Sequence, residues 1–367
     1  MKRKQLPKID YVLTGTTLGL LAFGLLAVSS ASTVLSFERF GNNHYYFMRQ
    51  LFFGAVPGLL MMYFFSRIDY HKWQKIAPLL VLAGIAMLSA VLIPSIGFKV
   101  GNARRWIDFH YFLFQPAEFV KLAMIVYLAS WYDKRQQHAH DLYYGFLPSL
   151  MIVIVVAGLI MLEPDIGTML VLIAIAFAMF FAGGAMLKHL ASVALAGLLV
   201  MWIAIKAAPY RLQRILAYFN PSSDTQGIAY QINQALIAIG SGGLWGLGFG
   251  QSRQKYNYLP EPVGDSIFAI MSEELGFIRV SGVILLFLVF AYKGFKIAWQ
   301  TADVFGKMLG VGITSWIVLQ ALINIGGITG TIPLTGIPLP FVSYGSSALA
   351  LSLAGVGILL NISRYAK

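Results

Sequence analysis

Residues 250–277 form the stretch that best indicates both the fold and the site of chemistry: GQSRQKYNYLPEPVGDSIFAIMSEELGF. It ends the only long polar interval between hydrophobic segments and runs directly into an apolar helical pattern. Asp265 lies at this junction, and Arg253 and Lys255 lie upstream. A carboxylate at the boundary of a membrane helix, near cations that can hold an anion, favours chemistry on a charged lipid head group.

The composition identifies an integral membrane protein. Of 367 residues, 58% are hydrophobic and 11% are charged, and the apolar runs have the length of about 17 to 25 residues that a bilayer core requires of a helix. The formal net charge is +12, but most basic residues flank apolar segments, where they orient the protein and touch anionic membrane lipid. We therefore expect no nucleic-acid partner. Cysteine is absent, which excludes a disulfide framework and a thiol nucleophile.

The apolar pattern predicts an all-α fold with ten transmembrane helices in a single domain, residues 1–367. The predicted spans are 11–31, 46–65, 77–94, 112–131, 146–162, 166–184, 189–208, 266–292, 307–327 and 345–362. The fifth and sixth must be separated at Glu163, Pro164 and Asp165, because a continuous helix over 146–184 would be almost twice the bilayer thickness. A large extracytoplasmic loop, about 209–264, lies between spans 7 and 8.

Ten spans place both termini on one side of the membrane, and the loops of that side are basic. These loops carry Arg67, Lys72, Lys75, Lys134, Arg135, Lys188, Lys293, Lys296 and Lys307. The excess of lysine and arginine predicts that this side, with both termini, is cytoplasmic. The first span is expected to be an uncleaved signal anchor, since its apolar core is longer than that of a signal peptide and more spans follow.

The segment GNARRWIDF contributes three candidate ligand-binding residues: Arg104, Arg105 and Trp106. The planar fork of arginine suits phosphate oxygens, and a tryptophan at head-group level can face a sugar. In the alternative interpretation, the arginines extend to lipid phosphate and the tryptophan anchors the chain at the interface.

Lys121 lies about two turns inside its predicted span, where an unpaired ammonium is costly. Glu118, one turn back, is the local candidate partner, and Asp165 is the long-range one. In either case we expect a structural ion pair and not a catalytic group.

The segment GITGTIPLTGIPLPFVSYGSSAL, residues 327–349, is too rich in proline and glycine to continue a helix. We expect an extended loop that folds back into an outer vestibule, because irregular backbone at membrane depth must be covered by protein or line a cavity. Ser343, Tyr344, Ser346 and Ser347 then offer hydroxyls to a ligand. The alternative is that Ser343 or Ser346 caps the last helix.

Asp265 also has an alternative role, since Gly-Asp-Ser before an apolar run is a good helix start. A helix N-terminus lowers the pKa of a carboxylate and opposes its use as a base, unless apolar surroundings raise the pKa again. Glu261, Glu273 and Glu274 are the alternative acids, and Glu261 is also a candidate ligand-binding residue.

Five of these motifs, in order and at suitable intervals, resemble the SEDS family (shape, elongation, division and sporulation). They are GNARRWI, QPAEFVKLA, LEPDIGT, GLGFGQSRQKYNYLPEP with DSIFAIMSEELGF, and GIPLPFVSYGSSAL. The match covers nearly the whole chain, and ARRW and GQSRQKYNYLPE are more similar to the cell-division branch than to the elongation branch. Three departures are VGDS where relatives commonly have HTDF, Arg279 at a position of a small residue, and YGSS for YGGS.

The resemblance implies a peptidoglycan glycosyltransferase of the bacterial cytoplasmic membrane with its active site on the extracytoplasmic face. Such an enzyme polymerises lipid II into glycan strands during septal cell-wall synthesis and releases polyprenyl diphosphate. The implied partners are lipid II, the nascent glycan strand, a class B penicillin-binding protein of the FtsI type and other membrane proteins of the divisome.

The resemblance also implies residue roles. Asp265 matches the family's essential acid and would be the general base. Lys121 and Asp165 match its buried ion pair, and Arg104 and Arg105 match basic residues of its outer cavity. There is no compact metal motif, so a divalent cation, Mg²⁺ or Mn²⁺, is expected on substrate phosphate and one carboxylate.

Three other functions stay open. A flippase would move the lipid-linked precursor without breaking bonds, although its essential charges should lie near the midplane, whereas these candidates cluster outward. A polymerase of the elongation branch would perform the same chemistry. A scaffold of the division machinery would tolerate changes at Asp265.

Overall fold

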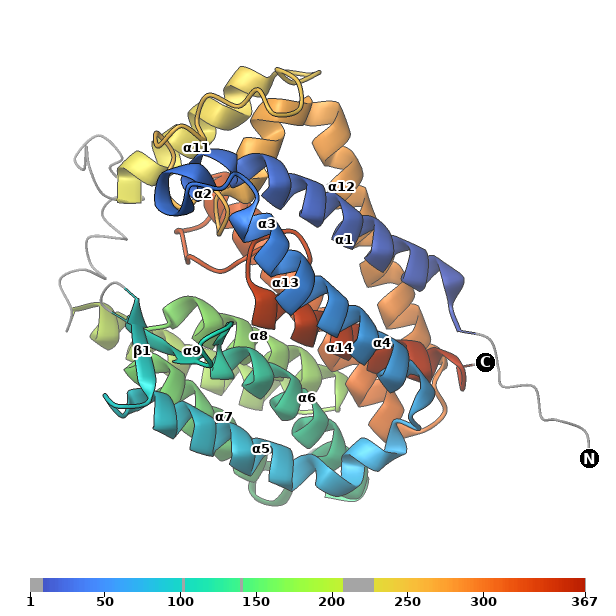
Figure 1. The fold of residues 1–367 in the computed structure, drawn as a ribbon. Helices are drawn as coiled ribbons and strands as arrows, with labels where there is room; N and C mark the ends of the chain where they lie inside the picture. The colour runs from blue at the N-terminus through green and yellow to red at the C-terminus, as the bar shows by residue number, and fades with distance from the viewer. Residues whose placement is uncertain (1–8, 101–102, 139–140, 207–227, 367) are drawn as a thin grey trace, which may run out of the picture.

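The computed structural model describes residues 9–100, 103–138, 141–206 and 228–366, and within them the chain is mostly helical (Figure 1). The α-helices are α1 Tyr11–Ala31, α2 Thr33–Phe40, α3 Tyr45–Gln50, α4 Val56–Arg67, α5 His71–Leu92, α6 Pro116–Lys134, α7 Leu147–Leu162, α8 Ile166–Ala182, α9 Leu187–Lys206, α11 Ile228–Gly242, α12 Ile267–Gln300, α13 Val304–Ile328 and α14 Ser346–Ser363. A π-helical turn, Leu51–Ala55, joins α3 to α4, and another, Leu142–Phe146, precedes α7.

Seven helical segments of the described chain are long and apolar enough to cross a membrane. They coincide, within two residues at the ends, with the first, second, third, fifth, eighth, ninth and tenth predicted spans or include them, so a mostly helical, multi-pass architecture is confirmed. The other three predicted spans fall on α6, α8 and α9. α8 has only 17 residues, and the count of ten stays a prediction. Residues 209–227 of the predicted large loop lie outside the described residues.

The two described ends of the chain lie at one end of the helix bundle. The backbone N–H of Asp10, just before α1, donates to Ser363 Oγ at the end of α14 (3.1 Å), and Figure 1 shows these two segments side by side. The Tyr70 N–H, after α4, donates to Asn361 Oδ1 at the same end (2.9 Å). We call the opposite end of the bundle, where the α7–α8, α11–α12 and α13–α14 connections lie, the loop end.

α13 and α14 form the centre of the molecule. Residues buried inside the protein make up 72% of the apolar window of α13 and 78% of that of α14, against 28% in α5. α14 packs closely on α4 because a glycine of each helix lies against the other helix. A Cβ on Gly357 would lie 2.6 Å from the Met62 carbonyl oxygen, and one on Gly58 would lie 2.6 Å from Leu353 Cδ1. Larger residues at these positions would separate the two helices.

The ARRW motif lies on a small antiparallel sheet, which the sequence did not predict. Its strands are β1 Gly97–Val100, β2 Ala103–Asp108 and β3 Leu113–Phe114, in the order β1-β2-β3. Arg104 on β2 pairs with Lys99, and Trp106 pairs with Phe98. The sheet gives the two arginines a fixed backbone where the sequence indicated only a loop.

α12 is interrupted at Gly276, which has φ 77° and ψ 172°. The α11–α12 connection fills the break, because the Phe277 N–H donates to the Gly243 carbonyl (2.9 Å). A Cβ on Gly276 would lie 2.2 Å from the Gly246 nitrogen. Both the positive φ and this close approach require glycine here. The short part of α12 that precedes Gly276 is therefore joined to the α11–α12 connection.

Candidate functional site

Asp265 lies at the loop end, immediately before α12, with 8% of its surface exposed. Its Oδ1 accepts hydrogen bonds from Gln231 Nε2 of α11 (3.2 Å) and from Ser266 Oγ (3.4 Å). Its backbone carbonyl accepts one from Asn324 Nδ2 of α13 (2.9 Å). The N-cap of α12 is Ser266, so Asp265 does not cap this helix and its side chain is available for another role.

The second carboxylate oxygen, Oδ2, faces the connection between α13 and α14. Gly336 lies next to it with φ +73°, and a Cβ built there would be 3.7 Å from Oδ2. No hydrogen bond to Oδ2 is formed within the described part of the chain. One oxygen of Asp265 is therefore fixed by neighbours, and the other has no hydrogen-bond partner among the described residues.

The surroundings of Asp265 raise the pKa of its carboxyl into the range suited to a general base at neutral pH. Burial raises the pKa of Asp265 to about 7, and the negative charge of Glu261 adds to the rise. The hydrogen bonds from Gln231 and Ser266 act in the opposite direction and lower the pKa. A carboxylate with a pKa near the operating pH can take a proton in the transition state.

The connection between α13 and α14 is a buried, irregular loop, as predicted from its prolines. Leu339 and Phe341 are 1% and 3% exposed. Asn324 Nδ2 donates to the Ile337 carbonyl (2.8 Å), and Gln320 Nε2 donates to the Pro338 carbonyl (2.9 Å). Two amide side chains, one turn apart on α13, therefore satisfy the loop backbone beside Asp265.

The four predicted hydroxyl residues, at the end of this loop and the start of α14, contact other protein groups. Ser343 Oγ donates to the Gly264 carbonyl (2.7 Å) and accepts from the Leu339 N–H (2.8 Å), which fastens the loop to the segment before Asp265. The other contacts are Ser346 Oγ to the Arg49 carbonyl (3.4 Å), the Gln115 N–H to Ser347 Oγ (3.3 Å), and the edge of the Tyr344 ring on Tyr46. No side-chain cap hydrogen bond forms at the start of α14. Ser343 thus holds the loop in place, and its contact with substrate stays a prediction, as it does for the other three.

Arg104 and Arg105 differ in what they bind. Arg105 Nε donates to the Glu163 carbonyl (3.2 Å), its Nη2 donates to the Pro164 carbonyl, and its Nη1 lies 3.9 Å from Asp165 Oδ2. Arg104 is half-buried and makes no side-chain hydrogen bond or ion pair with the described residues. Arg105 therefore fixes the α7–α8 turn to the sheet, while the Arg104 guanidinium is available to an anion.

The α13–α14 loop connects the arginine region to Asp265. Gly167, in the first turn of α8, packs so closely on this loop that a Cβ there would lie 2.7 Å from the Thr335 carbonyl oxygen. The next loop residue, Gly336, faces Asp265. The α13–α14 loop therefore contacts the start of α8, next to the turn bound by Arg105, and also lies beside the Asp265 carboxylate.

Glu163, in the α7–α8 turn, is a buried acid whose environment the sequence did not predict. It is fully buried, and neither of its side-chain oxygens has a hydrogen-bond partner among the described residues. Burial raises the pKa of Glu163 to about 8, the Asp165 charge adds to the rise, and Arg105 opposes it. An unpartnered buried carboxyl with this pKa is mostly protonated at neutral pH.

The predicted ion pair between Lys121 and Asp165 is not formed. Lys121 Nζ instead binds Glu118 Oε1 (2.8 Å), the local candidate, and Gln320 Oε1 (2.8 Å), and it lies 5.1 Å from the ring centre of Trp316. Lys121 and Glu118 are each 1% exposed. The nearer glutamate on the same helix face satisfies the ammonium.

Asp165 has other partners. Its Oδ1 accepts from the Thr168 N–H (3.1 Å) as the N-cap of α8, and its Oδ2 accepts from Gln115 Nε2 (3.3 Å). Together with Arg105, these groups are the partners of the Asp165 carboxylate in place of Lys121.

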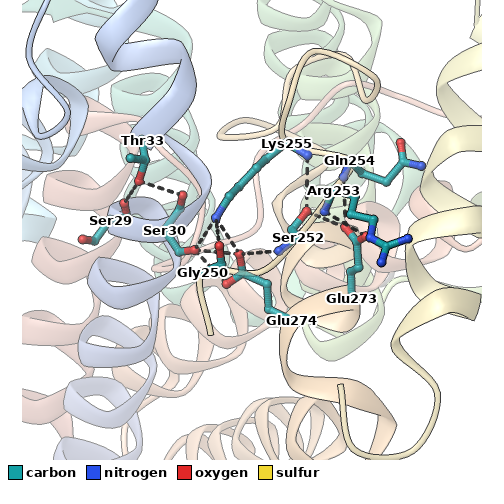
Figure 2. Close-up of polar contacts among 10 residues, drawn as sticks. All are labelled: Ser29, Ser30, Thr33, Gly250, Ser252, Arg253, Gln254, Lys255, Glu273 and Glu274. Atoms are coloured by element: carbon teal, nitrogen blue, oxygen red, sulfur yellow. Dashed lines mark hydrogen bonds and ion pairs between the residues drawn. The ribbon is translucent and has the colours of Figure 1, made fainter. Parts of the chain in front are cut away.

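Lys255, expected to bind substrate, is instead part of a buried network (Figure 2). Its ammonium binds Glu274 Oε1 (3.0 Å), the Gly250 carbonyl (2.7 Å) and Ser30 Oγ of α1 (3.3 Å). It is 4% exposed. Lys255 therefore links α1, the α11–α12 connection and α12, and it cannot bind substrate without breaking this network.

Glu273 closes the same network from the other side. It accepts from Ser252 Oγ and from the backbone N–H groups of Arg253 (3.1 Å) and Gln254 (3.3 Å). The Arg253 side chain is exposed and stays a candidate for substrate. Glu273 and Glu274 are 1% and 0% exposed, so these two alternative acids are occupied with holding the loop.

The family model described as cell cycle protein FtsW/RodA/SpoVE matches residues 11–367. The chain belongs to this family. Stage V sporulation protein E of Bacillus subtilis is 44% identical to it over 358 residues, which cover 98% of each chain. The probable peptidoglycan glycosyltransferase FtsW of Trichlorobacter lovleyi is 40% identical over 98% of this chain and 94% of that relative.

Two solved structures superpose on nearly all of the chain. One is a chain from a structure of a peptidoglycan synthase complex, described as coordinating polymerization and crosslinking. It has a TM-score of 0.81 and 26% identity, and the match covers 97% of this chain and 98% of that one. The rod shape determining protein RodA of Thermus thermophilus has a TM-score of 0.72 and 25% identity, covering 97% of both chains. The family resemblance seen in the five motifs is confirmed.

Proposed function

We propose that the protein is a peptidoglycan glycosyltransferase that polymerises lipid II and releases polyprenyl diphosphate. Membership of the FtsW/RodA/SpoVE family and the names of its FtsW relatives support this activity. The observation that carries the proposal is the state of Asp265, a buried carboxyl with a pKa of about 7, one oxygen held and the other available.

Asp265 would act as the general base. The acceptor sugar hydroxyl forms a bond to the anomeric carbon of the donor, its proton passes to Asp265 Oδ2, and the bond from that carbon to the lipid diphosphate breaks. The Arg104 guanidinium, which has no partner among the described residues, would offset the charge that develops on the departing diphosphate. Exposed Glu261 and Arg253 lie on the segment that leads to Asp265 and would face the substrate.

A divalent cation, Mg²⁺ or Mn²⁺, stays part of the proposal. The described residues contain no group of three or more acidic, histidine or cysteine side chains suited to a metal ion. The cation would therefore be held mainly by substrate phosphate together with one carboxylate, and it would supply positive charge for the diphosphate.

The proposed setting is the bacterial cytoplasmic membrane, with both termini cytoplasmic and the loop end extracytoplasmic. The shared location of the described ends of the chain and the basic loops at that end support this orientation. A class B penicillin-binding protein is the proposed partner, which agrees with the synthase complex that one structural match belongs to. The 40% identity to an FtsW relative supports a role in septal synthesis.

Purified protein in detergent, mixed with lipid II and its penicillin-binding partner, tests the activity. The proposal predicts glycan polymer that a muramidase digests. A flippase makes no new bond, and in detergent there is no bilayer to cross. Lipid II that stays monomeric, with folded protein and an active partner, would contradict the proposed activity.

A further inference from the structure

Gln231, the fourth residue of α11, contacts both residues that precede α12. Its Nε2 donates to Asp265 Oδ1 (3.2 Å) and to Ser266 Oγ (3.0 Å). The side chain is half-buried and reaches across from a helix that ends more than twenty residues before Asp265. A single amide group thus fixes both residues that precede α12.

We propose that Gln231 is a positioning residue for the catalytic carboxylate. Its N–H group holds Oδ1, and this orientation leaves Oδ2 facing Gly336 as the oxygen that takes the proton from the acceptor hydroxyl. The inference rests on the proposed function, because it assigns a role to Gln231 only if Asp265 is the base.

The contacts around Asp265 make Gln231 the residue that sets this orientation. Asn324 binds the backbone carbonyl of Asp265 and not its carboxylate. Ser266 Oγ is at 3.4 Å and is itself bound by Gln231. Gly336 contributes no side chain. Removing Gln231 would therefore release the carboxylate from its better-placed donor and leave a hydroxyl that has lost its own donor.

The charged surroundings are simple enough to make pH a clear readout. Glu261, on the segment before Asp265, is the one charged side chain of the described structure that alters the pKa of Asp265. The groups from α11, α12, α13 and the α13–α14 loop are uncharged: Gln231, Ser266, Asn324 and Gly336. Because a hydrogen bond to the ionised carboxylate favours that form, its loss raises the pKa.

The experiment measures kcat/KM for lipid II polymerisation from pH 5.5 to 9 in wild type, Gln231→Ala and Gln231→Glu. A base must be deprotonated, so activity rises with pH through its pKa. In Gln231→Ala the acid limb should move up by about one pH unit, lowering kcat/KM roughly tenfold at acid pH and restoring it at alkaline pH. In Gln231→Glu, a second carboxylate beside Oδ1 should move the limb further in the same direction.

Gln234→Ala is the matched control, because Gln234 lies one turn along α11 and makes no side-chain hydrogen bond with the described residues. Its acid limb should match that of wild type. Gln231→Glu keeps the size of the side chain, so it decides the question if Gln231→Ala fails to fold. Wild-type acid limbs in the folded Gln231 variants would overturn the inference, whereas absence of polymer from wild type would overturn the proposed function instead.

Discussion

Asp265 differs from the neighbouring acids in what binds its carboxylate. Glu273 and Glu274 each accept hydrogen bonds from three donor groups of the surrounding protein. Asp265 is also buried, but its donors reach only one oxygen. The fully bonded carboxylates stabilise a loop, and the partly bonded one is available for chemistry.

Replacing Arg104 and replacing Arg105, the two arginines of β2, should affect different properties: substrate binding for Arg104 and stability for Arg105. Arg104→Ala should raise the KM for lipid II about tenfold, since one charge-assisted contact to phosphate is lost, and should leave the thermal unfolding temperature unchanged. Arg105→Ala should lower that temperature, because the Glu163 and Pro164 carbonyls lose their donor. Steady-state kinetics and thermal unfolding in detergent check both.

Lys99→Ala is the control for Arg104→Ala. Lys99 is an exposed cation on β1, and its backbone lies opposite that of Arg104 in the sheet. A KM equally affected in Lys99→Ala and Arg104→Ala would indicate a general charge effect and contradict a specific contact.

At the residue scale, the sequence indicated Asp265 as a candidate but did not indicate its neighbours. Asp265 could be selected because its position at an apolar boundary and its motif are local properties of the chain. Gln231 and Asn324 come from helices distant in sequence, and nothing in their local pattern marks them as facing Asp265. The partner of Lys121 was chosen wrongly because the partners of Asp165 depend on where Arg105 and the α7–α8 turn lie.

At the scale of the elements, α6 and α13 are joined by buried polar groups. Lys121 of α6 binds Glu118 on its own helix and Gln320 on α13, and the Gln320 amide continues to the Pro338 carbonyl. The Lys121–Glu118 ion pair is therefore connected, through Gln320, to the α13–α14 loop beside Asp265.

Removing either charge of this pair should destabilise the protein. Lys121→Ala leaves a buried carboxylate without a cation, and we expect a loss of about 3 kcal/mol in unfolding free energy. A double-mutant cycle of Lys121→Met and Glu118→Gln should give a coupling energy of about 1 kcal/mol or more. The same cycle with Asp165→Asn should give a coupling near zero, and a larger coupling to Asp165 than to Glu118 would contradict the structure.

Hydropathy predicted where helices occur but not how they are interrupted. Each predicted span falls mainly on a helix in the described chain, because burial in lipid requires long apolar runs. The break in α12 at Gly276 depends on a connection that packs against it, and one glycine in an apolar run does not reveal that contact. The sheet carrying Arg104 was missed because its strands are short and lie between two spans.

At the scale of the whole molecule, the α11–α12 connection is fastened to the first helix. Lys255 binds Glu274 and Ser30, so α1 and α12 are held together by one buried ammonium (Figure 2). Lys255→Met should lower the unfolding free energy by about 3 kcal/mol, because the buried Glu274 carboxylate loses its cation.

Arg253→Ala is the control for Lys255→Met in thermal unfolding, since the Arg253 side chain is exposed. It should change stability by no more than about 0.5 kcal/mol. Equal unfolding temperatures for Lys255→Met and wild type would show that the network does not hold the connection in place.

The central claim is that Asp265 is the general base, and Asp265→Asn tests it most directly. Asparagine keeps an oxygen that can accept the Gln231 hydrogen bond, but it cannot take a proton at neutral pH. The measurement is the rate of glycan polymer formation by the purified variant with its penicillin-binding partner and lipid II, alongside thermal unfolding. We predict an unfolding temperature close to that of wild type and a loss of at least about 100-fold in polymerisation rate. Polymer formation at a near wild-type rate by folded Asp265→Asn would contradict the claim.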